Sequence, residues 1–249
     1  MKKSKLGTVA FLFAFALFYW VGCQTDASMP LTGYYFPQAA AQDGIVYQFE
    51  EQGFQSGPEY WYFTSKERED SLFLITTVYS SDFEQQQLSI ERKVSNGWIQ
   101  EQLLLFFPDG EKTRQASVEI KTQNTFAFDL EDSLELIHYS ISWEENLDST
   151  IAQKRLFRNK RFLGFDTLNI MGEPSRVAKF LVRDMIEDER QGTLTLHIKS
   201  YESYAQGWGL VKKDQYYMRG EKEQLIRSLR LVDTLSMSTL EREFKENLQ

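Results

Sequence analysis

The side chains of this sequence that could do acid, base or nucleophilic chemistry are few and widely spaced. Two histidines occur, His138 and His197, each on the polar side of an alternating apolar and polar stretch. No partner stands at the spacing typical of a metal site, and no H-E-x-x-H or G-x-S-x-G element occurs. Gly207 and Gly209 lack the third glycine of a dinucleotide-binding loop and precede an apolar strand. We therefore expect no catalytic residue, no cofactor and no metal ion.

The single cysteine, Cys23, follows a segment with the layout of an export signal. Lysines at positions 2, 3 and 5 precede an apolar run from Val9 to Val21, shorter than the roughly 20 residues that span a bilayer. A lone cysteine forms no internal disulfide, and a free thiol is a liability in an exported chain unless it is used. Val21, Gly22 and Cys23 resemble a lipoprotein lipobox, which implies removal of residues 1–22 and acylation of Cys23, for instance by palmitate. An uncleaved anchor or an ordinary secreted chain is the alternative.

The charge of the chain limits its partners. The chain holds 28 Lys and Arg against 36 Asp and Glu, and without the three lysines of the leader the net charge falls from −8 to −11. Anionic head groups and nucleic acid repel such a chain, so we expect no nucleic-acid partner. The membrane contact must then come from the acyl chains on Cys23, several of which anchor a protein stably. We expect a cell-envelope protein anchored to the outer membrane and facing the periplasm.

The remainder of the chain predicts one mainly β domain. Residues 23–32 are small and polar, as in a tether, and residues 33–249 contain no second linker. In ELIHYSISW the apolar residues Ile137, Tyr139 and Ile141 alternate with polar ones, the period of a strand with one buried face. Turn signals divide the domain into about a dozen such strands. Because so many antiparallel strands curl or close, we expect a single curled sheet or barrel, lipocalin-like or half-barrel, with a two-layer sandwich as second choice.

Turn and cap signals place the connections. Asn96-Gly97 predicts a type I′ hairpin, and FPDGEK, RNKR, MGEPS and ERQGT predict further turns. A short C-terminal helix is expected near 238–247, where Ser238 and Glu241 have the spacing of a capping box. Charges that interrupt the apolar rows, such as Arg92 and Lys93, favour a domain outside the bilayer over an outer-membrane barrel.

Four consecutive aromatic residues, Tyr60 to Phe63, raise the question of a binding site. In a strand Tyr60 and Tyr62 face one side, while Trp61 and Phe63 face the other, and Pro58 marks the start. We predict a central strand covered on both faces, at the place to look for a cavity. The candidate surface for an apolar ligand comprises Trp61, Trp98 and Trp208.

A basic island stands out against the acidic background. It comprises Lys154, Arg155, Arg158, Lys160 and Arg161, interleaved with apolar residues. Interleaved basic and aromatic residues can bind a phosphate-rich partner. We favour the alternative, a charged and solvated hairpin turn at Arg158 to Lys160.

Several stretches in a fixed order resemble a group of uncharacterised lipoproteins from Bacteroidota. They are YYFPQAAAQDGIVYQFE, PEYWYFTSKERED, LITTVYSSDFE, VSNGW, LFRNKRFLGF and YAQGWGLV, read as a Y-F-P opening, a Y-W-Y strand, an R-N-K-R-F hairpin and a Y-A-x-G-x-G-L-V strand. This resemblance implies a cell-envelope β protein and no particular activity. A second likeness, to lipocalin-like hydratase and AttH-type proteins with an E-W-W-Y-F strand, covers about ten residues around Glu59, Trp61, Tyr62 and Phe63.

Three function hypotheses follow. We favour a non-catalytic envelope module that holds an apolar ligand, such as an acyl chain or isoprenoid, or docks an envelope protein. The first alternative is a lipocalin-like enzyme on an apolar substrate, with Glu59, Tyr60 or His197 as acid or base. It requires one of these side chains to point into a closed pocket. The second is a structural subunit of an envelope complex, which requires an exposed apolar patch or an unpaired strand edge.

Overall fold

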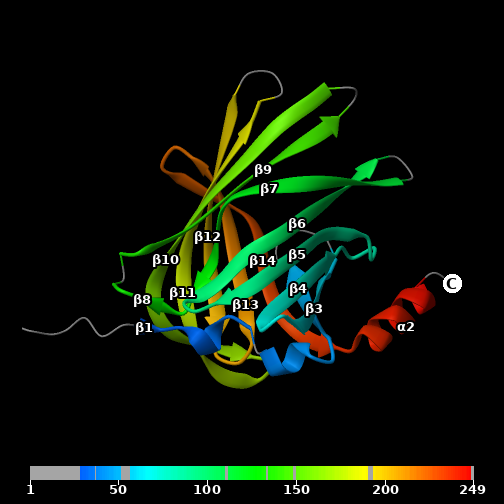
Figure 1. Cartoon of the computed structure of the whole chain (residues 1–249), viewed down its shortest axis with the longest axis vertical. Helices are drawn as coiled ribbons and strands as arrows, with labels where there is room; N and C mark the ends of the chain where they lie inside the picture. The colour runs from blue at the N-terminus through cyan, green and yellow to red at the C-terminus, as the bar shows by residue number, and fades with distance from the viewer. Residues whose placement is uncertain are drawn as a thin grey trace, which may run out of the picture.

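The computed structural model describes residues 29–36, 38–51, 57–109, 112–132, 134–147, 150–189 and 193–247 (Figure 1). The expected signal peptide and the expected lipidation site, Cys23, lie outside these residues.

In the described ranges, twelve antiparallel strands close into one barrel (Figure 1). Their order is β10-β11-β12-β13-β14-β2-β3-β4-β5-β6-β7-β9, so neighbours are consecutive in the chain except at β14–β2 and β7–β9. The strands are β2 (Ile45–Glu51), β3 (Glu59–Arg68), β4 (Ser71–Tyr79), β5 (Gln85–Val94), β6 (Gly97–Asp109), β7 (Lys112–Ala127), β9 (Leu136–Leu147), β10 (Thr150–Ile170), β11 (Glu173–Asp188), β12 (Leu194–Ala205), β13 (Gly209–Arg219) and β14 (Lys222–Leu235). The prediction of a mainly β, barrel-like domain is confirmed, and the barrel is closed.

Alternation of side chains explains why these segments form barrel strands. In β9, Ile137, Tyr139 and Ile141 are buried, whereas His138 is exposed. The period of two places one row inside the barrel and one row outside. Closure comes from the pairing of β14 with β2, which sets Leu231 opposite Phe49 and leaves no free edge between the first and last barrel strands.

The hairpin predicted at Asn96-Gly97 forms, but its type and register differ from the prediction. Val94 pairs with Gly97, so Ser95 and Asn96 make the turn, and the φ of Asn96 is not positive. The side chain of Asn96 instead bonds both backbone groups of Asp129, donating to its carbonyl at 3.0 Å and accepting from its N–H at 2.8 Å. This tertiary pairing outweighs the local preference for a type I′ turn.

Of the other predicted turns, MGEPS forms, and the strand residues on its two sides, Ile170 and Glu173, pair with each other. FPDGEK and ERQGT contain residues 110–111 and 190–192, which lie outside the described residues, although β6 ends and β7 begins beside the first and β11 ends and β12 begins beside the second. The turn expected at RNKR is wrong, because β10 runs unbroken through it. Arg158 and Lys160 lie on the same face as the buried Phe162, and carboxylates of β11 and β12 pair with them.

The stretch YAQGWGLV is also not one strand. It is the β12–β13 hairpin, in which Gln206, Gly207 and Trp208 form the turn. Gly209 has a φ of +80°, and a Cβ there would lie 2.1 Å from the carbonyl oxygen of Tyr35. The glycine is therefore required by the close approach of an N-terminal segment.

That segment, residues 29–36 and 38–41, is termed here the N-terminal plug. It contains β1 (Met29–Pro30), which pairs with β8 (Asp129–Leu130), and the 3-10 helices η1 (Thr32–Tyr34) and η2 (Gln38–Ala41). Residues 29–32 were expected to belong to a tether, which is wrong. Leu31 is fully buried and donates its N–H to the carbonyl of Phe128. Burial of an apolar side chain of this size stabilises the docked segment by about 2 kcal/mol, which exceeds what a free polar tether would gain.

The plug lies at one end of the barrel (Figure 1), and the aromatic core fills the interior at that end. The buried rings and aliphatic side chains there include Tyr34, Tyr47, Phe49, Phe63, Trp98, Phe126, Phe162, Phe180 and Tyr204. Their rings pack at tilted or edge-on angles, such as 86° between Phe180 and Tyr204. This end of the barrel is therefore closed by side chains.

The aromatic strand β3 is covered on both faces, as predicted. Its outward residue Tyr60 packs with Val46 and with Leu240 of α2 (Met237–Asn247), and its inward residues Trp61 and Phe63 face the barrel interior. The helix thus lies on the outside of β2 and β3 (Figure 1).

The N-cap of the helix lies two residues before the predicted cap, Ser238. Ser236 accepts the N–H of Thr239 at 3.1 Å through its Oγ, so Ser236 is the N-cap. Ser238 lies within the first turn, and its spacing to Glu241 therefore does not form a capping box. Leu240 packs against Val46, and this contact fixes which face of the helix is buried, which the capping pattern alone could not predict.

Candidate ligand-binding site

A cavity of about 620 Å³ occupies the half of the barrel that the aromatic core leaves unfilled. Its lining runs from Tyr35 and Tyr204 at the closed end to Gln86, Pro108 and Thr113 at the opposite end. The last three residues are exposed, so the cavity opens to solvent beside the start of β5 and the β6–β7 hairpin. This volume lies within the range of small-molecule sites.

One side of the cavity is apolar. Strands β6, β9 and β10 present Leu103, Ile141, Trp143 and Leu156, termed here the apolar wall. These positions follow the inward period of two along their strands, and register pairing places Ile141 opposite Leu156. An apolar ligand surface placed against this wall would be removed from water.

The floor of the cavity is a network of buried polar groups, termed here the floor network. It comprises Tyr35, Glu91, Lys160, Glu202 and Tyr204. Tyr35 donates its hydroxyl to Glu91 at 2.6 Å. Lys160 donates to the hydroxyl of Tyr204 at 2.7 Å and lies 3.0 Å from Glu202, and Tyr204 in turn donates to Glu202 at 2.8 Å. These contacts satisfy groups that would otherwise be costly to bury.

Burial and neighbouring charges shift the pKa values of the two carboxyl groups in the floor network in opposite directions. Burial raises the pKa of Glu91 above its ordinary value, although hydrogen bonds from Thr125 and Tyr35 oppose this. Burial alone would also raise the pKa of Glu202, but the charges of Lys160, Lys213 and Arg158 outweigh it and hold this pKa below its ordinary value. Two carboxyl groups on one floor thus have different proton affinities.

Two further cations lie beside the floor network. Arg158 donates from Nε and Nη2 to the two oxygens of Asp184, both at 2.8 Å, and this bidentate pair crosses from β10 to β11. Burial alone would lower the pKa of Arg158, but the charge and hydrogen bonds of Asp184 raise it. Lys213 of β13 lies 3.7 Å from Glu202, and burial, opposed by that carboxylate, lowers the pKa of Lys213.

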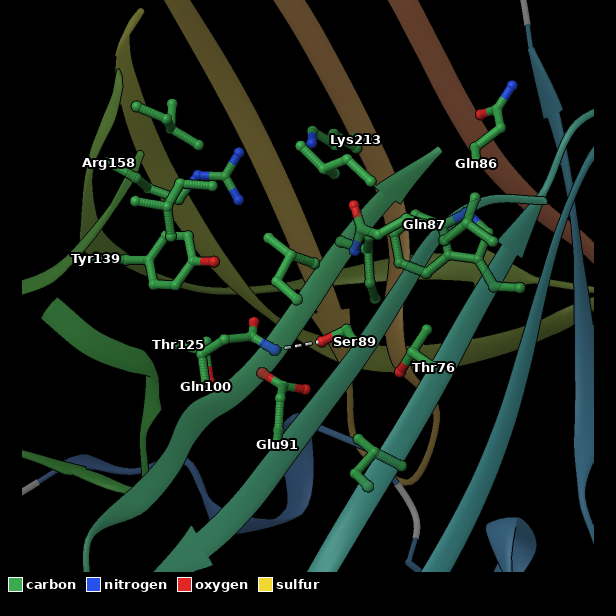
Figure 2. Close-up of a pocket in the computed structure, with 18 of the residues that line it drawn as sticks. Thr76, Gln86, Gln87, Ser89, Glu91, Gln100, Thr125, Tyr139, Arg158 and Lys213 are labelled. Atoms are coloured by element: carbon green, nitrogen blue, oxygen red, sulfur yellow. Dashed lines mark hydrogen bonds between the residues drawn. The ribbon is translucent and has the colours of Figure 1, made fainter. Parts of the chain in front are cut away.

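Figure 2 shows how these side chains face the cavity. Arg158 and Lys213 extend into it from strands on one side, and their charged ends turn toward one another. Glu91, Ser89, Gln100 and Thr125 gather below them. Gln100 donates to the hydroxyl of Ser89 at 2.7 Å and is thereby fixed in place.

A second group of charged side chains lies near the mouth, on the side of the barrel formed by β14, β2 and β3. Arg227 is paired with Glu51 at 3.2 Å and with Glu59, and the indole N–H of Trp61 also donates to Glu59. Glu59 therefore points into the barrel, and its oxygens are held by Arg227 and Trp61.

The structure distributes the candidate tryptophans between cavity and core. Trp61 lines the cavity. Trp98 is buried in the aromatic core, with its ring centre 5.8 Å from that of Tyr35, and Trp208 packs against the same core. Neither lines the cavity, so only Trp61 of the three is positioned to contact a molecule bound there.

The residues named for the enzyme alternative do not come together. Glu59 lies in the cavity, Tyr60 packs against Phe83 beneath α2, and His197 is exposed on β12. His138 is exposed as well and shares a hydrogen bond of 2.6 Å with Asn159. Across the described ranges, no group of three His, Cys, Asp or Glu side chains could hold a metal ion.

Sequence reasoning missed the buried charges that dominate the cavity floor. The basic island splits by alternation, with Arg158 and Lys160 inside the barrel and Arg155 outside, where it pairs with Glu187 and Glu189. A signal did exist in the sequence, because Arg158 and Lys160 share the parity of Leu156 and Phe162.

Comparison with known proteins shows the fold. No protein-family model and no curated protein matches the chain. A solved structure of a Bacteroides fragilis protein described as exported, with a YmcC-like fold, is similar at 14% identity and a TM-score of 0.56, covering 82% of this chain and 100% of that one.

Two further solved structures resemble the chain. One is described as a lipoprotein from Parabacteroides distasonis, at 13% identity and a TM-score of 0.49, covering 82% of this chain and 99% of that one. The other is the hypothetical lipoprotein YmcC from Escherichia coli, at 15% identity and a TM-score of 0.34, covering 94% and 97%. Within the part of the chain that the structure describes, no helix has the length and apolar character to cross a membrane.

Proposed function

We propose that this protein is a non-catalytic envelope lipoprotein whose barrel interior binds an elongated, largely apolar molecule of the acyl or isoprenoid class. The observation that carries this proposal is the cavity of about 620 Å³ with an apolar wall on one side and a mouth at the barrel end opposite the N-terminal plug. Apolar side chains that line a cavity have no packing partner on one side, so a cavity of this kind favours a binding role over a scaffold role.

The envelope location rests on the leader and on Cys23. Cys23 stands six residues before Met29, a distance that an extended chain covers in at most about 20 Å. Acyl chains on Cys23 would hold the plugged end of the barrel toward the outer membrane, and the cavity mouth would face away into the periplasm. A ligand would then enter from the aqueous side and not directly from the bilayer.

Docking by strand addition is less well supported. Every strand from β2 to β7 and from β9 to β14 has a neighbour on both sides, so backbone without a partner strand is confined to parts of strands, such as Phe162 to Ile170 of β10, which pairs with β11 alone. A protein partner would have to bind such a short edge or a side-chain surface.

The proposal is tested with the mature chain carrying C23S, which removes the acyl chains. Native mass spectrometry of the protein isolated from the envelope should detect an added apolar molecule. An uncharged fluorescent probe, N-phenyl-1-naphthylamine, should bind with one-to-one stoichiometry. If only the bare polypeptide is detected and the probe does not bind, the proposed function is wrong.

A further inference from the structure

Lys213 is poorly matched to its surroundings in the barrel interior. Its Nζ lies 3.7 Å from Oε1 of Glu202, whereas Lys160 lies 3.0 Å from the other oxygen of the same carboxylate. Glu202 is thus shared by two lysines. The side chain of Lys213 keeps 16% of its surface accessible, and because Lys213 lines the cavity, its ammonium can meet a bound molecule.

Arg158 provides a second accessible cation on the same side. Asp184 accepts from its Nε and Nη2, which leaves Nη1 for another acceptor. The side chain of Arg158 keeps 28% of its surface accessible, whereas Asp184 keeps 4%. The charged ends of Arg158 and Lys213 turn toward the same part of the cavity (Figure 2).

The local charges leave a positive surplus. Arg158, Lys160 and Lys213 face Asp184 and Glu202, so this group carries one more cation than anion. Glu91 is a further carboxyl group of the cavity lining, but it accepts the hydroxyl of Tyr35 and lies outside this group of ion pairs. A buried surplus charge is costly unless an opposite charge joins it.

The position of these cations relative to the apolar wall indicates how a bound ligand would be oriented. Arg158 pairs with Tyr139 across β10 and β9, and the next inward pair toward the mouth is Leu156 with Ile141. A molecule with one charged end could therefore place that end beside Lys213 and Arg158 and its apolar body along the wall.

We propose that the ligand carries an anionic head group, a carboxylate or a phosphate monoester, which binds Lys213 and Arg158 near the cavity floor while the apolar body extends toward the mouth. This inference rests on the proposed function and specifies the ligand class. Both head groups accept hydrogen bonds from a lysine ammonium and an arginine guanidinium.

The test is displacement of N-phenyl-1-naphthylamine from the mature C23S chain by dodecanoate, dodecyl phosphate and dodecanol. These share one apolar body and differ in the head group. We expect the better anion to displace the probe at about one tenth of the concentration that dodecanol requires, or less. The two anionic arms distinguish a carboxylate ligand from a phosphate ligand.

Variants then assign the effect to a residue. K213M should weaken the anions about tenfold and leave dodecanol unchanged. K212M is the matched control, because Lys212 pairs with Asp214 at 2.5 Å and does not line the cavity, so it should change neither.

The outcomes separate the two proposals. If dodecanol binds as tightly as both anions, or if K213M weakens all three ligands equally, the anionic head group is wrong and the proposed binding function stands. If the probe itself does not bind, the proposed function is wrong as well. Should K213M fail to fold, the comparison of head groups on the chain with Lys213 intact still decides.

Discussion

Lys213 should reduce the stability of the protein without ligand, because its ammonium is largely buried and lies 3.7 Å from the nearest carboxylate. Burial lowers the pKa of Lys213, so its charged form is disfavoured in the folded state. The contribution to stability from a lowered lysine pKa is complete above the ordinary value of 10.5 and is lost as the pH falls through the folded pKa. At neutral pH the charge of Lys213 is therefore a cost.

The prediction at Lys213 is that K213M stabilises the protein without ligand. We expect the free energy of unfolding at pH 7 to rise by about 1 kcal/mol. The gain should shrink as the pH approaches the ordinary lysine pKa, where the buried amine is neutral in both states. Urea unfolding of both proteins from pH 7 to 10 measures this. A less stable K213M at pH 7 would mean that the lysine is structural.

Glu202, in contrast to Lys213, stabilises the folded protein at neutral pH. Its pKa is held below the ordinary 4.5, so its stabilising contribution is present above pH 4.5 and is lost as the pH falls toward the folded pKa. We predict that E202Q costs about 3 to 5 kcal/mol at pH 7, because Lys160 and Lys213 lose their carboxylate. The acid-induced loss of stability should also be smaller in E202Q.

Urea unfolding at pH 7 and at acidic pH tests the role of Glu202. The matched control is E223Q, because Glu223 pairs with Lys199 near the surface and should contribute about 1 kcal/mol or less. Equal effects of E202Q and E223Q would show that the floor network is not specially stabilising.

At the scale of elements, the C-terminal helix shows where local pattern and tertiary packing disagree. The capping pattern placed the helix start at Ser238, but Ser236 is the N-cap in the structure. Removing a capping oxygen costs about 1 kcal/mol. We predict that S236A lowers the free energy of unfolding by that amount and that S238A lowers it less. A larger loss in S238A would indicate that Ser238, and not Ser236, is the N-cap.

The contact of this helix with the barrel gives a second prediction. Leu240 is buried against Val46 and Tyr60, so L240A should destabilise the protein by about 2 kcal/mol or more. Arg242 is exposed on the same helix, and R242A should be nearly neutral. Denaturant midpoints of the two variants provide the comparison. Equal midpoints would show that the helix does not depend on this packing.

The elements differ in how far the sequence predicts them. Strands such as β9 and the aromatic β3 follow from alternation, because one face of each strand is buried and the other meets water or a covering helix. Turn signals fail at RNKR and misplace the turn at Asn96-Gly97, where pairing with distant carboxylates or with Asp129 decides the local conformation. Such partners lie far away in the chain, and no local pattern encodes them.

At the scale of the whole molecule, closure follows from the number of antiparallel strands, but the interior does not. Alternation predicts that a row faces inward without saying whether it fills the barrel or lines a cavity. Here the N-terminal plug helps to fill one half, and Leu31 within it was expected to belong to a tether. The candidate site was therefore found from sequence at Trp61 but missed at Lys213 and the floor network.

The anchoring proposal makes a prediction for the intact cell. Expressed with its leader, the chain should fractionate with the outer membrane, and C23S should no longer reach the outer membrane. Cell fractionation with detection of the chain measures this. Recovery of C23S in the outer-membrane fraction equal to that of the unchanged chain would contradict acylation at Cys23 as the anchor.

The central claim is that a largely apolar molecule binds inside the barrel between Trp61 and Trp143, which both line the cavity. The most direct test is quenching of tryptophan fluorescence by bromine-substituted dodecanoate in the mature C23S chain, since bromine quenches only at short range. We predict saturable quenching that W208F retains and that the double variant W61F/W143F loses. Quenching that persists in W61F/W143F, or that never saturates, would contradict binding in the cavity.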